Sequence, residues 1–196
     1  MTSERSDGST QLDPDLRSSL IPALTTRAEL DDFEARNILA AMMWARRARA
    51  DHRDMLQPST LRLLHRRMFD MTWTWAGQFR TVDTNLGVPW QLIPTQLEQL
   101  CGNVRFQIEH DVFGWNEISA RFHHQLVSIH PFVNGNGRHA RLATDLLRRR
   151  HGLEPFRWGR DTDPSPQTIR RNYLAALRLA DSGDISALIQ FASGAD

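Results

Sequence analysis

The chain has 196 residues, of which 40% are hydrophobic and 24% charged, so it carries enough apolar material for one sizeable core. This composition excludes a disordered or fibrous chain. The 24 basic residues are all arginine and are balanced by 23 acidic residues to a formal net charge of +1. Because binding to nucleic-acid phosphates needs a clustered basic surplus, we expect no direct nucleic-acid partner.

Two features of the sequence favour a reducing, cytoplasmic location. Cys101 is the only cysteine, so it cannot form an internal disulfide and offers no metal or redox pair. The stretch from Met1 to Leu20 is polar and lacks the apolar core of a signal peptide. No run reaches the roughly 20 apolar residues that a membrane helix needs, so we expect a cytoplasmic protein without a membrane partner.

The N-terminal part of the chain changes from a polar lead-in to helical patterns. Residues 1–14 are rich in Ser, Thr, Asp and Gly and predict a flexible N-terminus. From Thr25 onward, apolar residues recur at spacings of three and four, which predicts a helix within an N-terminal helical segment, residues 15–57. A second helix is predicted over Pro58–Met71, at the start of a main domain that covers residues 58–196.

The remaining chain alternates one irregular stretch with further helical patterns. Between Thr72 and Pro94, aromatic and branched residues mix with Thr, Asn and Gly, which favours a small β-hairpin. Helical periodicity returns over residues 96–110, 117–130, 138–150, 165–180 and 185–192. The chain shows no repeat and no alternation of strands and helices. The predicted fold class is therefore all-α, with one small β element.

The most informative segment runs from His130 to Arg141 and reads His-Pro-Phe-Val-Asn-Gly-Asn-Gly-Arg-His-Ala-Arg. Pro131 disfavours a helical backbone at the residue before it, so the preceding helix should end at His130. The Gly-Asn-Gly stretch permits the positive φ angles that turn consecutive N–H groups inward as an anion nest. The N-terminus of the next helix adds unpaired N–H groups and the positive end of its dipole.

Two arginines complete the pattern in this segment. Arg138 opens the second helix, and Arg141 lies one turn further on the same side. A base that is neutral near pH 7, an anion nest and two arginines on one face indicate a polyphosphate site. The alternative is an ordinary helix-loop-helix with arginines as surface charge, but the density of these features in one short segment favours the functional interpretation.

The segment resembles the signature of the Fic (Fic/Doc) family: His-Pro-Phe, any residue, Asp or Glu, Gly-Asn-Gly-Arg, two residues, Arg. The resemblance extends from about Pro58 to Ala192, because Trp75 to Thr81 is similar to the family's target-docking flap and Tyr173 to Leu177 is also similar. More narrowly, the sequence Asn-Gly-Asn-Gly-Arg-His-Ala-Arg and the chain length resemble the subgroup called mobile mystery protein B. This subgroup occurs on mobile elements beside a helix-turn-helix protein.

The resemblance implies a mainly helical Fic fold with a β-hairpin flap and a nucleotidyltransferase activity. Such an enzyme moves AMP from ATP to a Ser, Thr or Tyr hydroxyl of a target protein and uses Mg²⁺. The partners implied are that target protein and, for the subgroup, a helix-turn-helix protein in a toxin-antitoxin-like pair. Residues 58–196 would form the Fic domain.

Carried over to this sequence, the resemblance implies that His130 is the general base that accepts the proton of the target hydroxyl. A histidine with an ordinary pKa of about 6.5 is mostly the free base at neutral pH. Phe132 would anchor the loop in the core. The nucleotide phosphates would be held by Gly135, Asn136, Gly137, Arg138 and Arg141.

One position departs from the family pattern. Asn134 stands where the family has the Asp or Glu that binds magnesium. An amide oxygen can ligate magnesium but brings no charge, and magnesium prefers carboxylates and phosphates. The metal site is therefore expected to be weak, and three alternatives stay open: a slow enzyme, an enzyme with another nucleotide or phosphate donor, and a nucleotide binder without turnover.

A second resemblance concerns regulation. Many Fic proteins carry an inhibitory helix with the pattern Ser or Thr, three residues, Glu, then Gly or Asn, whose glutamate pairs with the second arginine of the signature. Thr25 and Glu29 match the first two elements, whereas Leu30 replaces the last. Thr26 and Glu29 also match a capping box, which is the competing structural explanation.

Several further residues have predominantly structural explanations. His123 and His124 lack the spacing of metal ligands and are expected on a partly exposed polar face. We also expect an exposed His139 and a solvated run at Arg148–Arg150. Trp90 or Trp158 could help line a nucleotide pocket. The family resemblance implies in addition that Asn172 and Tyr173 approach the adenine.

Overall fold

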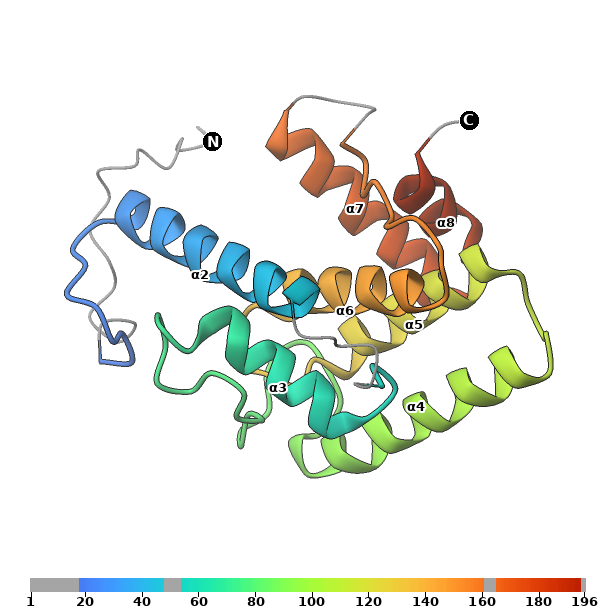
Figure 1. Ribbon diagram of the computed structural model, residues 1–196, viewed down its shortest axis with the longest axis horizontal. Helices are drawn as coiled ribbons and strands as arrows, with labels where there is room; N and C mark the ends of the chain where they lie inside the picture. The colour runs from blue at the N-terminus through green and yellow to red at the C-terminus, as the bar shows by residue number, and fades with distance from the viewer. Residues whose placement is uncertain (1–17, 48–53, 161–164, 195–196) are drawn as a thin grey trace. The chain divides into compact units, whose positions relative to one another are not determined.

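The computed structural model describes residues 18–47, 54–160 and 165–194, and within them the fold is mainly helical (Figure 1). The described helices are α2 (Arg27–Arg47), α3 (Pro58–Phe69), α4 (Ile93–Glu109), α5 (Trp115–Ile129), α6 (Asn136–Arg150), α7 (Pro166–Asp181) and α8 (Ser186–Ser193), with a short 3₁₀ helix η2 (Trp90–Leu92). Every predicted helix is present and begins and ends close to its expected residues. The prediction for residues 1–14 lies outside the described residues.

The chain divides into two compact units. The first contains the described residues before position 53 and residues 62–78, and the second contains residues 54–61 and the chain from Phe79 onward. The division falls within α3. The domain boundary expected at residue 58 stays a prediction.

The first unit is organised around buried polar contacts of α2. The Glu34 carboxylate accepts a hydrogen bond from the Trp73 indole at 2.6 Å. Asn37 accepts from the Thr72 hydroxyl at 3.1 Å and from the backbone N–H of Met71 at 3.1 Å. Because a buried polar group is costly unless it is hydrogen-bonded, these pairs fix how α2 meets the turn at residues 70–74.

The second unit is built around α5. This helix contacts α4, α6 and α8, and α7 packs on α8 (Figure 1). Its buried apolar residues include Ile118, Phe122 and Leu126. A small cluster of Ala120, Ala176 and Leu188 brings α5, α7 and α8 together. Full burial of a Leu or Phe side chain contributes about 1.5–3 kcal/mol. This apolar core therefore stabilises α5 and the helices that pack on it.

The predicted β-hairpin is absent from the described residues 72–94, where the expectation was wrong. Only an isolated antiparallel bridge between Phe79 and Phe132 forms in the second unit. The physical reason is that the Arg80 guanidinium donates to the carbonyls of Val82 and Val88. A side chain thus takes acceptors that a hairpin would pair with backbone N–H groups.

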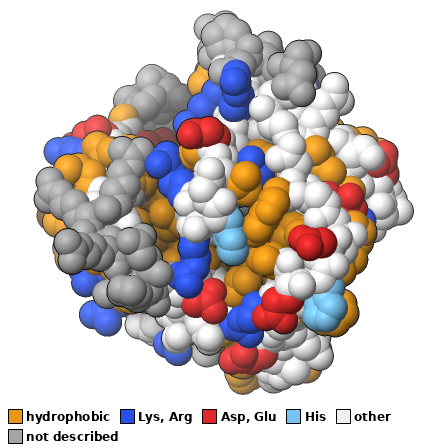
Figure 2. Space-filling model, turned by 45° about the vertical axis from the view of Figure 1, so that its right-hand side comes forward, with side chains coloured by type: hydrophobic (Ala, Val, Ile, Leu, Met, Phe, Trp, Pro, Cys, Tyr) orange, Lys and Arg blue, Asp and Glu red, His pale blue; other side chains and the backbone are white. Residues whose placement is uncertain are grey.

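No described helix is long and apolar enough to cross a membrane. On the face seen in Figure 2, hydrophobic side chains are exposed beside arginine and acidic ones. Large exposed hydrophobic residues in the stretch that leads into α4 are Val82, Leu86, Trp90 and Leu92.

Candidate functional site

His130 follows the last residue of α5, as the proline after it predicts. Its backbone is left-handed, with φ 52° and ψ 57°, and its side chain is half-buried. A non-glycine residue in this region costs of the order of 1 kcal/mol, so the surrounding contacts must hold it there. This backbone turn places the His130 side chain between the end of α5 and the loop that leads to α6.

The environment of His130 favours the neutral imidazole. Burial lowers its pKa below the ordinary value of 6.5, and the positive charge of Arg80 lowers it further. A hydrogen bond with the Val127 backbone acts in the opposite direction. Because burial is the largest of these effects, His130 is the free base at neutral pH.

The loop after His130 is braced by the side chain of Asn136. Its Oδ1 accepts from the Phe132 N–H at 3.0 Å, and its Nδ2 donates to the Phe132 carbonyl at 2.8 Å. Both residues are buried, and the Phe132 ring lies against Phe79 with centroids 5.7 Å apart. Phe132 is therefore the core anchor that was expected, and the Asn136 amide is engaged in shaping the loop.

The glycine-rich turn forms the N-terminus of α6. Gly135 has φ 79° and precedes the first residue of the helix, which confirms the predicted positive φ at this position. Gly137 lies within the first turn of α6, where the ring hydroxyl of Tyr173 is 3.5 Å from the position that a Cβ would take. The loop thus presents one left-handed residue followed by the open N–H groups of a 15-residue helix.

Arg141 is supported on two sides. Its Nε donates to the Gly137 carbonyl at 3.3 Å, and its guanidinium lies 5.2 Å from the centroid of the Tyr173 ring. Burial is the main effect that lowers the Arg141 pKa, Tyr173 acts in the opposite direction, and the charges of Arg160 and Arg138 lower the pKa further. An arginine remains charged under such shifts, so the three guanidinium groups create a region of positive potential at the start of α6.

Tyr173 links Arg141 to the interior of the unit. The Tyr173 hydroxyl is hydrogen-bonded to His123 Nε2 at 3.0 Å. His123 is fully buried, and burial is the main reason that its pKa falls to about 3. The expectation of a partly exposed His123 was therefore wrong, because Tyr173 supplies a partner from α7. The Tyr173 ring lies against Arg141, and its expected position beside a nucleotide stays a prediction.

Two other expectations of exposure were wrong for similar reasons. His139 is fully buried, with Nε2 hydrogen-bonded to the Leu61 carbonyl at 2.9 Å, and burial lowers its pKa to about 4. Arg148 is 8% exposed and donates to the Glu154 carbonyl at 2.7 Å and to Asn116 Oδ1 at 3.0 Å. The neighbours Arg149 and Arg150 are exposed, as predicted.

The other residues that the sequence indicated as secondary candidates differ in burial. Trp158 is buried, and its indole donates to Asp145 at 3.1 Å, whereas Trp90 is 37% exposed. His124 Nε2 is hydrogen-bonded to Asp181 Oδ1 at 2.8 Å, and Asn172 is exposed.

Asn134 does not make a magnesium site by itself. Its side chain is exposed, and Oδ1 accepts from the Gly135 N–H at 2.7 Å. The described residues hold no group of three or more His, Cys, Asp or Glu side chains that could bind a metal ion. The residues present therefore do not fit a resident Mg²⁺ ion, because the one amide oxygen carries no charge and already has a donor.

Thr25, Thr26 and Glu29 form the capping box of α2. Glu29 Oε2 accepts from the N–H groups of Thr25 and Thr26 at 2.9 and 3.0 Å, and Thr26 Oγ1 accepts from the Glu29 N–H at 3.3 Å. The hydrogen bond from the Thr25 backbone, followed by that from Thr26, lowers the Glu29 pKa to about 2. The structural explanation weighed for this motif is confirmed.

Two residues that the sequence interpretation did not single out lie against His130. The Arg80 Nε donates to the His130 carbonyl at 2.8 Å. Gly87 has φ 101°, and a Cβ there would lie 2.6 Å from His130 Cβ. The signals available were an arginine in the stretch that resembles the family's flap and a glycine in the loop that follows, and neither has a characteristic spacing from the signature.

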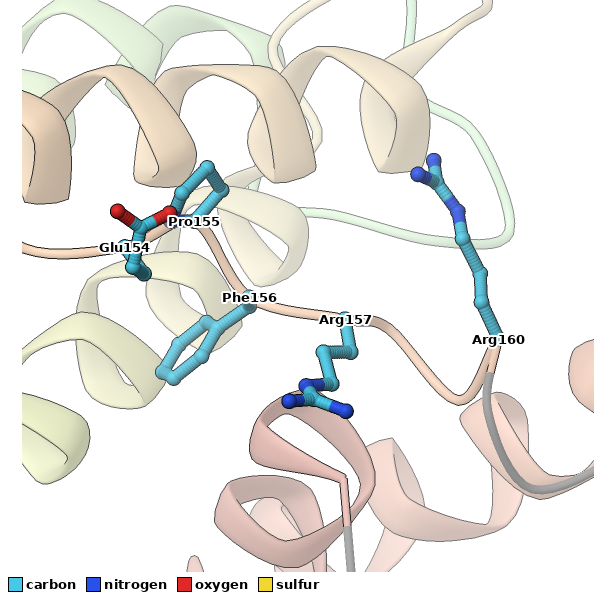
Figure 3. A pocket seen from close by; sticks show the side chains of 5 residues that line it. All are labelled: Glu154, Pro155, Phe156, Arg157 and Arg160. Atoms are coloured by element: carbon cyan, nitrogen blue, oxygen red, sulfur yellow. The ribbon is translucent and has the colours of Figure 1, made fainter.

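A separate pocket of about 410 Å³ lies in the segment between α6 and α7. It is lined by Glu154, Pro155, Phe156, Arg157 and Arg160. Figure 3 shows that the Arg157 and Arg160 side chains are directed to opposite sides of the chain. These two guanidinium groups therefore do not converge on a shared ligand in this pocket.

The comparisons with known proteins agree with this geometry. Residues 55–147 match the model of the Fic/DOC family. The fold resembles the N-terminal Fic domain of a putative cell filamentation protein from Bartonella quintana, with a TM-score of 0.69 and 15% identity, over 95% of this chain and 88% of that chain. It also resembles Fic-1 from Caenorhabditis elegans, with a TM-score of 0.68 and 24% identity, over 90% of this chain and 51% of that chain.

Two curated relatives match parts of the sequence. Protein adenylyltransferase fic-1 from Caenorhabditis briggsae is 32% identical over 119 residues, which is 59% of this chain and 22% of the relative. A uridine 5'-monophosphate transferase from Xanthomonas campestris is 53% identical over 45 residues, which is 23% of this chain and 8% of the relative. The chain thus spans less than a quarter of the length of either relative. Residues 55–147, which contain the signature segment, match the Fic/DOC family, and the chain has the fold of solved Fic structures.

Proposed function

We propose that the chain is a nucleotidyltransferase that moves AMP from ATP to a Ser, Thr or Tyr hydroxyl of a target protein. One observation carries this proposal: a neutral, half-buried His130 lies one short loop away from the helix N-terminus that bears Arg138 and Arg141. The names of the curated relatives support it, since several are called protein adenylyltransferases. The fold is also similar to that of the effector protein BepC from Bartonella tribocorum, whose structure was solved with bound AMPPNP.

The proposed chemistry is an in-line displacement at the α-phosphorus. The target hydroxyl gives its proton to the imidazole of His130 as its oxygen bonds to the α-phosphorus. The bond from that phosphorus to the bridging oxygen of the β-phosphate breaks, and pyrophosphate leaves with the bonding electrons. The proton on His130 then passes to solvent, which restores the base.

Binding and charge stabilisation come from the start of α6. The helix N–H groups and the Gly135 turn would face the α- and β-phosphates, with Asn136 and Gly137 in the first turn. Arg138 would offset charge on the leaving β-phosphate, and Arg141 would hold the γ-phosphate. Each charge-assisted hydrogen bond to phosphate is worth roughly 1.5–3 kcal/mol.

Magnesium would supply charge neutralisation on the triphosphate when bound. Since the residues around Asn134 do not form a magnesium site alone, most ligands would have to come from the nucleotide phosphates. The steps assigned above to His130, Arg138 and Arg141 do not depend on a protein-bound ion.

The second candidate is a regulatory protein that binds a nucleotide with little turnover. The observation that favours it is the uncharged Asn134, whose Oδ1 already accepts a hydrogen bond from the Gly135 N–H. In this form the chain could act with a helix-turn-helix protein in a toxin-antitoxin-like pair, as the subgroup resemblance suggests.

Autoinhibition by Glu29 belongs to the same proposal. The Thr25 and Glu29 spacing supports it, although the carboxylate in this structure caps its own helix. Glu29→Gln keeps an acceptor oxygen for the cap but loses the charge that would pair with Arg141, whereas Glu29→Gly removes both. If Glu29 restrains the site, both variants transfer nucleotide faster than the parent chain. Equal rates in all three proteins, together with a lower melting temperature for Glu29→Gly, would assign Glu29 to capping alone.

A labelling experiment separates the two functions. The protein is incubated with a cell lysate, Mg²⁺ and ATP or UTP labelled at the α-phosphate, alongside His130→Ala and the control His110→Ala, which alters an exposed histidine. The proposal predicts labelled protein with ATP, retained in His110→Ala and lost in His130→Ala. If calorimetry detects ATP binding but no protein is labelled, the regulatory candidate is supported. Label from UTP alone would show that the nucleotide donor is UTP and not ATP.

A further inference from the structure

Arg80 is an almost fully buried cation whose hydrogen bonds go to backbone carbonyls. The residue is 2% exposed. Its Nε donates to the His130 carbonyl at 2.8 Å, and its Nη1 donates to the Val82 carbonyl at 2.9 Å. Nη2 donates to Val88 and makes a longer contact of 3.5 Å with the Ile129 carbonyl. Burying a charge is costly unless its donors are hydrogen-bonded, and here Nε, Nη1 and Nη2 of Arg80 all have carbonyl partners.

These acceptors belong to two different segments. The carbonyls of Ile129 and His130 lie at the end of α5, where the last C=O groups of a helix have no partner within it and where the helix dipole favours a cation. The carbonyls of Val82 and Val88 belong to the loop that follows Arg80. The planar fork of one guanidinium therefore joins this loop to the backbone on which His130 is built.

The loop makes direct contact with His130 on the same side. A Cβ at Gly87 would lie 2.6 Å from His130 Cβ, 2.7 Å from Arg80 Nη2 and 3.0 Å from the Ile129 carbonyl. The Val88 N–H also donates to that carbonyl at 3.3 Å. Gly87 thus combines a positive φ with a close approach that a larger residue would prevent.

We propose that Arg80 is a positioning residue that holds His130 in its left-handed conformation and fixes residues 81–88 against it. The base role of His130 rests on the proposed function, whereas the positioning of His130 does not. A further contact orients Arg80 from the outside, since Nη1 lies 3.7 Å from the exposed carboxylate of Asp83.

The test compares Arg80 with Arg148, a second buried arginine that also donates to backbone and side-chain acceptors. The 196-residue chain and the variants Arg80→Met, Arg80→Lys, Arg148→Met and Arg148→Lys are titrated by NMR at the histidine Cε1 protons. His130→Ala assigns the His130 signal. This readout requires no transfer activity.

We expect Arg80→Met to move the His130 Cε1 signal and to raise the His130 pKa, because a nearby positive charge is lost and the imidazole gains solvent. Arg80→Lys retains the charge but not the fork, so it should not restore the parent signal. In transfer assays, both variants should lower the maximal rate about tenfold, with the KM for ATP changed less than about twofold. The Arg148 variants should lose stability and leave the His130 signal in place.

Equal His130 spectra for the parent chain and a folded Arg80→Met variant would overturn the proposal. If the Arg80 variants do not fold, Gly87→Ala provides the second arm. It keeps the arginine side chain, but its Cβ would lie within 2.7 Å of both His130 Cβ and Arg80 Nη2 and so forces the loop away from both. An unmoved His130 signal in folded Gly87→Ala would also overturn it. Absence of transfer in the parent chain would count against the proposed function alone, since the NMR comparison still decides the role of Arg80.

Discussion

At the scale of single residues, the proposed chemistry depends on the protonation of His130. Burial keeps its pKa below 6.5, so the free base predominates at neutral pH and is lost only on acidification. We expect the transfer rate to be flat around neutral pH and to fall on the acidic side, with an apparent pKa below 6.5. Rates measured under saturating ATP across this range check the prediction, and a midpoint at or above 6.5 would contradict it.

The buried histidines predict how stability depends on pH. The folded pKa of His139 is about 4, whereas the unfolded chain titrates near 6.5, so the unfolded state binds more protons between these values. The contribution of His139 is therefore present above pH 6.5 and is lost as the pH falls to about 4, by an amount of the order of 3 kcal/mol. Urea unfolding of the parent chain should show this loss, and His139→Gln should show a shallower slope. A parallel slope would contradict the assignment.

Asn134 gives a third prediction at this scale. Asn134→Asp restores a carboxylate at the position where the Fic signature has one, and a unit charge pair at 4 Å is worth about 4 kcal/mol at an effective dielectric of 20, before desolvation. We expect transfer to reach half of its maximal rate at about tenfold lower Mg²⁺. Val133→Asp is the control, because Val133 is an exposed neighbour outside the signature positions. The same gain in both variants would show that general negative charge is responsible.

At the scale of elements, Tyr173 of α7 contacts Arg141, which lies near the end of α6 that is proposed to bind phosphate. Tyr173→Phe keeps a ring beside Arg141 but leaves the buried His123 Nε2 without its hydroxyl partner. We expect a stability loss of about 1–3 kcal/mol with little change in ATP affinity. Tyr173→Leu removes the ring as well and should weaken ATP binding. Thermal unfolding and calorimetry distinguish these effects, and equal ATP affinity in both variants would contradict the supporting role.

The elements also show which parts of the fold the sequence predicts. Helices with apolar residues on one face, such as α4 and α5, follow from local periodicity and need no knowledge of their neighbours. The hairpin prediction failed because Arg80 takes the carbonyls of Val82 and Val88, and a side-chain hydrogen bond leaves no periodic signal. Propensity alone cannot anticipate such a competitor.

At the scale of the whole molecule, the candidate site also combines features that local sequence predicts with contacts between distant segments that it does not. The signature residues lie in one continuous segment, so their proximity follows from sequence order and from the turn chemistry of Pro131 and Gly135. The supports come from distant segments: Arg80 and Gly87 precede α4, and Tyr173 belongs to α7. His123, His139 and Arg148 look like surface residues by type, and only their tertiary partners explain why they are buried.

The molecule as a whole is proposed to break the bond between the α- and β-phosphates of ATP. The most direct test is a parallel incubation with ATP labelled at either the α- or the γ-phosphate, using the parent chain and His130→Ala in the presence of lysate and Mg²⁺. Nucleotidyl transfer predicts protein-bound label from the α-phosphate only, and its loss in His130→Ala. Label from the γ-phosphate, or α-label that persists in His130→Ala, would contradict the proposed reaction.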